Sequence, residues 1–69
     1  MTTIEKKARQ IIRKAYEDYK DCVRYGGDMQ FTYRQYQAQM DLLVELFPET
    51  TNQENLERKW DSEYRKAHY

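Results

Sequence analysis

The sequence predicts an all-α fold, most simply a small three-helix bundle that forms a single domain over residues 1–69. Apolar residues recur at helical spacing in each of three segments, and each segment begins with a Thr followed three residues later by Glu or Gln, the pattern of a capping box. Gly26-Gly27 and Pro48 separate the segments, since glycine ends helices and proline cannot continue one. The expected helices cover approximately residues 3–25, 33–47 and 52–67.

The first expected helix is long and amphipathic. Thr2 and Glu5 form its capping box, and Arg24 lies in its last turn, directly before the two glycines. At about 100° per residue, one arc of this helix carries its apolar side chains, which we expect to pack in the core. The arc consists of Ile4, Ala8, Ile11, Ile12, Ala15, Tyr19, Cys22 and Val23.

The second expected helix is the central one. An irregular connector over residues 28–31 precedes it, and Thr32 with Gln35 supplies the capping box. Phe31 and Tyr36 occupy the positions of a hydrophobic staple. The apolar face spans roughly 200° of the helical wheel, which implies contact on two sides. It consists of Tyr33, Tyr36, Met40, Leu42, Leu43, Val44, Leu46 and Phe47.

The third expected helix is polar on most sides. It starts near Thr51, which pairs with Glu54 in a third capping box. Charged pairs one turn apart, such as Glu54–Arg58, each add about 0.2–0.5 kcal/mol to its stability. A helix of this kind packs along one seam, and the apolar stripe for that seam is Leu56, Trp60, Tyr64 and Ala67.

Composition excludes several classes of protein. The 12 basic and 12 acidic residues cancel, which argues against a bulk polycation for nucleic acid and against a polyanion that imitates it. The single cysteine cannot form an internal disulfide, so we expect a cytoplasmic protein of its own or a host cell. The apolar stretch from Leu42 to Phe47 is too short to span a membrane, and the first residues lack the apolar run of a signal peptide.

The titratable residues do not predict an enzyme, a metal site or a cofactor. Cys22 lies on the apolar arc of the first helix, whereas a thiolate nucleophile needs a positioned base and an exposed site. The single imidazole, His68, is expected at the surface, and one His with one Cys cannot complete a tetrahedral zinc site. Acidic residues on the third helix are expected to form a solvated face rather than a cation site.

Basic residues project within roughly 60° of one another on the first helix, opposite its apolar arc. Over about 27 Å of helix they are spaced to follow a phosphate backbone or an acidic protein surface, and Tyr16 beside them is placed to stack on a base. The alternative is a solvated outer face that Glu17 partly neutralises. We call this set the basic stripe; it consists of Lys6, Arg9, Arg13, Lys20 and Arg24.

Tyrosine is frequent, with seven residues against four leucines, and tyrosine is enriched at protein interfaces. Tyr19, Tyr36 and Tyr64 fall on expected core faces. The remaining tyrosines are harder to bury in so small a fold, although scattered surface aromatics are also normal. With two residues of the expected connector they form the partner-facing set: Tyr16, Tyr25, Tyr33, Tyr69, Met29 and Phe31.

Two functions remain open. The first is a non-catalytic protein–protein interaction protein, an inhibitor or adaptor that sterically occupies a surface of a larger partner. Small accessory proteins of phages and mobile elements, including anti-defence inhibitors, often have this profile. The alternative is a nucleic-acid-binding module that uses the basic stripe, although no helix-turn-helix spacing or zinc site supports it. A homodimer that hides the wide face of the second helix is a further hypothesis.

Overall fold

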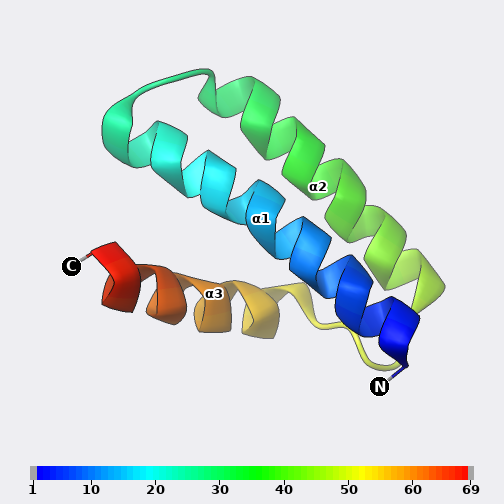
Figure 1. Cartoon of the computed structure of the whole chain (residues 1–69). Coiled ribbons are helices and arrows are strands. Elements are labelled where there is room, and N and C mark those ends of the chain that lie inside the picture. The colour runs from blue at the N-terminus through cyan, green and yellow to red at the C-terminus, as the bar shows by residue number, and fades with distance from the viewer. Residues whose placement is uncertain (1, 69) are drawn as a thin grey trace.

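The computed structural model describes residues 2–68, which form three α-helices and no strand. α1 covers Thr3–Tyr25, α2 covers Met29–Leu46 and α3 covers Gln53–His68. α1 and α2 form an antiparallel hairpin (Figure 1), and α3 packs across one face of this hairpin, where it contacts both helices. The predicted all-α three-helix bundle is thus confirmed.

α1 begins and ends at the expected residues. The Thr2 hydroxyl accepts a hydrogen bond from the Glu5 N–H at 3.1 Å, whereas the Glu5 carboxylate turns to Thr50, whose hydroxyl donates to it at 2.6 Å. The two glycines after α1 adopt φ angles of 92° and 144°, in the region that favours glycine. A Cβ atom on Gly27 would lie 2.9 Å from Cys22 Sγ, so this turn also requires glycine for space.

α2 begins one turn earlier than predicted. Asp28 caps it, because its side chain accepts a hydrogen bond from the Phe31 N–H at 2.9 Å. The Thr32 hydroxyl donates to the Asp28 carbonyl at 3.0 Å instead of capping the helix. The expected connector and the capping box at Thr32 are therefore wrong, since aspartate caps a helix as well as threonine does and is available directly after the glycine turn.

α3 begins one residue after the predicted start. The Asn52 side chain accepts a hydrogen bond from the Asn55 N–H at 3.0 Å, so Asn52 caps the helix in place of Thr51. Upstream, α2 ends immediately before Phe47-Pro48, as the proline predicts. The loop between α2 and α3 is therefore short, and it returns the chain to the N-terminal end of α1 (Figure 1).

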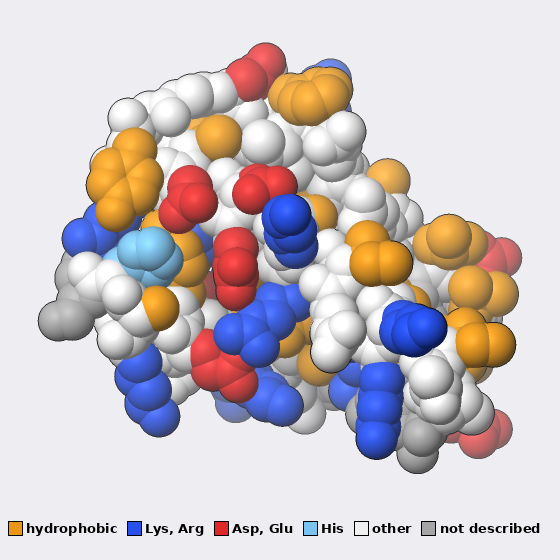
Figure 2. Space-filling view, in the orientation of Figure 1, with side chains coloured by type: hydrophobic (Ala, Val, Ile, Leu, Met, Phe, Trp, Pro, Cys, Tyr) orange, Lys and Arg blue, Asp and Glu red, His pale blue; other side chains and the backbone are white. Residues whose placement is uncertain are grey.

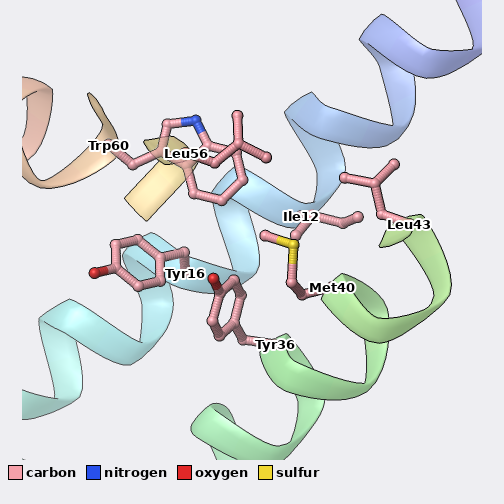
Figure 3. Close-up of a cluster of buried hydrophobic side chains, with 7 residues drawn as sticks. All are labelled: Ile12, Tyr16, Tyr36, Met40, Leu43, Leu56 and Trp60. Atoms are coloured by element: carbon pink, nitrogen blue, oxygen red, sulfur yellow. The ribbon is translucent and has the colours of Figure 1, made fainter. Parts of the chain in front are cut away.

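The core lies where α3 crosses the hairpin, and Figure 3 shows side chains of all three helices pointing into it. Tyr36 and Met40 of α2 have no exposed surface. From α3, Tyr64 is also buried, whereas Ala67 is exposed despite its place on the predicted stripe. The cluster in Figure 3 consists of Ile12, Tyr16, Tyr36, Met40, Leu43, Leu56 and Trp60.

In Figure 1, α1 lies between α2 and α3, and α2 also contacts α3 through the side chains of Tyr36 and Gln37. Leu42 and Leu46 are exposed, so the second side of the wide α2 face has no helix over it. Ile4, Ile11 and Val23 of the predicted apolar arc are exposed as well. The reason is that α3 packs on the face of α1 that carries the basic stripe, which leaves the aliphatic side of the hairpin open.

The assignment of Asp28 as the α2 cap predicts the effect of its removal. Asp28→Ala leaves the Phe31 N–H without its side-chain acceptor, and we expect it to lower the free energy of unfolding by about 1 kcal/mol. Urea unfolding followed by far-UV circular dichroism measures this. Thr32→Ala is the control and should cost less; a larger loss from Thr32→Ala than from Asp28→Ala would contradict the assignment.

Candidate interaction surfaces

The middle of the basic stripe faces α3. Arg13 lies 2.6 Å from a Glu63 carboxylate oxygen and 3.0 Å from one of Glu17, and the Lys20 ammonium lies 3.0 Å from Asp61. Figure 2 shows basic and acidic side chains interleaved over the centre of the molecule. The basic side chains that were expected to follow a phosphate backbone are therefore largely balanced by carboxylates of the same chain.

The ends of the basic stripe bind backbone carbonyl groups near the two ends of α3. Arg9 donates to the Thr50 carbonyl at 2.6 Å, in the loop before α3. Arg24 donates to the His68 carbonyl at 3.0 Å, at the C-terminal end of α3. Lys6, at the start of the stripe, is exposed. Most of the stripe therefore holds α3 against α1.

Tyr16 lies in the core, which corrects its expected place beside the stripe on the surface. It is 6% exposed, and its ring centroid lies 4.8 Å from that of Tyr36 and 5.8 Å from that of Trp60. Its hydroxyl donates to an Asp61 carboxylate oxygen at 2.7 Å. A ring buried in this way is not available to stack on a nucleic-acid base.

Two further buried tyrosines bond to carboxylates on neighbouring helices, among the described residues. Tyr36 of α2 donates to Glu57 of α3 at 2.6 Å, and Tyr64 of α3 donates to Asp21 of α1 at 2.6 Å. Hydrogen bonds to a charged acceptor are shorter and stronger than bonds between neutral groups. Sequence reasoning placed Tyr36 and Tyr64 in the core, but the pattern of apolar residues gave no signal for their carboxylate partners.

These surroundings keep the buried tyrosines neutral. Burial, followed by the hydrogen bond to a carboxylate, raises the pKa of Tyr16 and of Tyr36 well above the ordinary value of 10.0. The hydrogen bond to Asp21 raises the pKa of Tyr64 to about 12. Loss of the proton would place a phenolate against a carboxylate, so the folded chain binds these protons more tightly than the unfolded chain does.

Apolar side chains are exposed at the end of the hairpin, around the glycine turn. Tyr25 is 67% and Phe31 is 57% exposed, and Met29 and Tyr33 are exposed as well. We call these residues the hairpin-end cluster. Their exposure agrees with the partner-facing set expected from the sequence, although binding by them stays a prediction. Tyr69 of that set lies outside the described residues.

A second apolar surface is a groove between α1 and α2, with a volume of about 180 Å³. None of its lining residues comes from α3, and its exposed surface is apolar, because the side-chain oxygen of Gln39 is buried. In the sequence, only the width of the apolar face of the second helix indicates this surface. We call it the hairpin groove; its lining residues are Ala8, Ile11, Ile12, Gln39, Leu42, Leu43 and Leu46.

Cys22 and His68, the two residues weighed for catalysis, differ in exposure, since Cys22 is half-buried on α1 and His68 is exposed at the end of α3. Cys22 is half-buried beside the glycine turn, and the His68 ring stacks on Tyr64 with centroids 4.1 Å apart. Within residues 2–68, no group of three or more His, Cys, Asp or Glu side chains is placed to hold a metal ion. In the same part of the chain, every helix is too short or too polar to cross a membrane.

Comparison with known proteins gives no match of any kind: no family model, no curated protein and no solved structure matches this chain. The candidate surfaces therefore rest on the residues and contacts described above.

The buried tyrosines predict a loss of stability at high pH. Their contribution is complete below pH 10, where both states are protonated, and it decreases as the pH rises toward the raised pKa of the folded state. In that range each buried tyrosine, Tyr16 or Tyr36, should lower the free energy of unfolding by about 1.4 kcal/mol per pH unit. Urea unfolding at a series of pH values from neutral to about 11 measures the decline.

Tyr36→Phe tests the assignment. This variant should be less stable at neutral pH by about 1.5–3 kcal/mol, because a buried bond to a carboxylate is lost, and its alkaline decline should be shallower. Tyr25→Phe, at an exposed position, should retain the wild-type decline. An equal decline in Tyr36→Phe and wild type would show that Tyr36 does not contribute to it.

Proposed function

We propose that the protein acts by binding another protein, as a non-catalytic inhibitor or adaptor that covers a surface of a larger partner. The observation that carries this proposal is the hairpin-end cluster, in which aromatic and methionine side chains gather at one end of the molecule and face solvent. These residue types are enriched in the centres of protein interfaces. Apolar side chains grouped in this way mark interaction sites more often than side chains that are exposed singly.

The hairpin end is also preorganised for binding. The Met29 N–H donates to the Gly27 carbonyl at 3.1 Å, and the Asp28 cap fixes the start of α2. The guanidinium of Arg24 lies 5.4 Å from the centroid of the Tyr25 ring, so a charged group borders the apolar side chains. An apolar centre with a polar rim is the usual anatomy of an interface, and a fixed conformation lowers the entropy that binding costs.

The shape of the molecule suits steric action. The turn between α1 and α2 projects beyond α3 (Figure 1), so the hairpin end can enter a concave site on a partner while the rest of the chain covers its rim. Inhibitors that phages and mobile elements use against host defences are one class of protein that acts in this way.

A second candidate function is nucleic-acid binding, for which fewer basic side chains are exposed than the sequence predicts. A hollow of about 300 Å³ between α1 and α3 is lined by basic side chains, and none of its lining residues is acidic. Arg9 and Arg13 are engaged in the bonds described above, which leaves Lys6 and Lys59 as its exposed cations. Because so few cations face solvent here, the counterion release that drives binding to nucleic acid is small.

Affinity capture from the native cellular background, followed by mass spectrometry, tests the proposed function. The bait pair is the wild-type chain and a Tyr25→Ser/Phe31→Glu variant, which should lose the partner because truncating central aromatic residues weakens an interface at least about tenfold. Ala67→Glu adds a charge at an exposed position on α3 and should retain it. A partner held equally by both baits of the pair would refute binding through the hairpin end.

Binding to short DNA and RNA duplexes at about 50 and 200 mM salt tests the second function. We expect weak binding at the lower salt concentration and none at the higher one. The double variant Lys6→Glu/Lys59→Glu should abolish this weak binding. The control, Lys66→Glu on α3, should retain it. Tight binding with a steep salt dependence, lost in the double variant, would favour nucleic-acid binding over the proposed function.

A further inference from the structure

We propose that the hairpin groove binds the same groove of a second copy of this chain. The two chains then form a symmetric dimer whose centre is a four-helix bundle of two α1 and two α2 helices. This surface is separate from the hairpin-end cluster, so the inference goes beyond the proposed function, and each can fail without the other.

Large apolar side chains line the groove and its margins at the spacing of a helix–helix seam. Ile4 and Ile11, which are seven residues apart on α1, are 74% and 65% exposed. Leu42 and Leu46, which are one turn apart on α2, are 56% and 63% exposed. Stripes of this spacing bury apolar surface when another helix lies along them. The three-helix fold buries the opposite side of the hairpin and leaves this one open.

The register of the hairpin fixes which residues lie at the same level along its axis. Tyr16 lies level with Tyr36, with ring centroids 4.8 Å apart, and Tyr19 lies level with Tyr33, with centroids 5.2 Å apart. Because α1 and α2 run antiparallel, the same register places residue 7 level with residue 45 and residue 18 level with residue 34.

The rims of the groove carry opposite charges at those levels. Lys7 and Asp18 flank Ile11 on the α1 rim, and Arg34 and Glu45 occupy the outer side of α2. All four charged side chains are exposed, and none forms an ion pair within the described residues. This contrasts with the α3 side of the hairpin, where Arg13 and Lys20 have carboxylate partners.

Charge complementarity favours a two-fold axis parallel to the helices. A two-fold axis parallel to the helices lays α1 over the partner's α2 at the same level, so Lys7 meets the partner's Glu45 and Asp18 meets the partner's Arg34. Both pairings are favourable, and each occurs twice. A two-fold axis across the helices, centred near Ile11, would instead lay α1 over the partner's α1 and bring Lys7 close to the partner's Lys14. Like charges in that position oppose the second arrangement.

The available face is large enough for a small dimer interface. Two helices about 10 Å apart, each about 27 Å long and about 10 Å wide, present a face of about 540 Å², so two copies bury about 1,080 Å² in total, just above the roughly 1,000 Å² that a biological interface needs. Ile4, Ile11, Leu42 and Leu46 supply its apolar centre, and the charged pairs supply its rim.

Light scattering and sedimentation equilibrium of the full chain over a dilution series test the proposal. We expect a dimer at high concentration that dissociates on dilution. Leu42→Glu should raise the dissociation constant at least about tenfold and leave the helical content unchanged, because this side chain is exposed. Met29→Glu adds the same charge at the hairpin end and should leave dimerisation unaffected. A monomer mass at every concentration would overturn the proposal.

A charge exchange tests the symmetry. Lys7→Glu and Glu45→Lys should each weaken the homodimer about fivefold, because each places like charges at two points of the interface. An equimolar mixture of the two variants should form heterodimers of wild-type strength, since one Lys7–Glu45 pairing is kept and the other is restored with reversed sign. Stronger dimerisation of Lys7→Glu alone would indicate the axis across the helices and overturn the proposed pairing.

Capture experiments separate this inference from the proposed function. If the groove holds a different protein, the wild-type chain stays monomeric and Leu42→Glu loses a captured partner that Tyr25→Ser/Phe31→Glu retains; that result overturns the dimer. A dimer that forms normally in Tyr25→Ser/Phe31→Glu supports the inference, whatever that variant does to partner capture.

Discussion

The rest of the structure depends on hydrogen bonds between buried tyrosines and carboxylates, because α3 has only a narrow apolar stripe. Asp61 and Glu57 of α3 accept from Tyr16 and Tyr36 of the hairpin, so the polar side of α3 determines where this helix packs. Such bonds are directional, whereas burial of aliphatic surface is not. They orient α3 toward the face of α1 that carries the basic stripe, and the paired charges there follow from that choice.

The position of α3 explains why the molecule has one face on which opposite charges are balanced and another face on which apolar side chains are exposed. The formal net charge of zero arises from basic and acidic residues that largely meet at the α1–α3 contact. The aliphatic arc of α1 would usually recruit a third helix, but here it is left beside Leu42 and Leu46. A small domain can bury only part of its apolar surface, and this one leaves that part concentrated in two places, the hairpin end and the groove.

Sequence patterns predicted the number of helices, the glycine turn, the end of α2 at Pro48 and core positions such as Met40 and Trp60. They also predicted that Tyr25 and Phe31 face solvent. The patterns predicted the wrong surroundings for Tyr16 and for the basic stripe. A helical wheel assigns a charged face to solvent, because it does not include the carboxylates that another helix carries. The pairing is a property of two helices that are distant in sequence, whereas periodicity reports on one helix at a time.

The loop between α2 and α3 bears on the order in which the chain assembles. Glu5 and Arg9 hold Thr50 against the first turns of α1, and the Glu5–Thr50 bond joins residues 45 positions apart. The hairpin needs only the closure of a short glycine turn, whereas this bond requires a much longer loop to close, at a greater entropic cost. We therefore expect the hairpin to form first from contacts near in sequence, and α3 to dock on a surface that already exists.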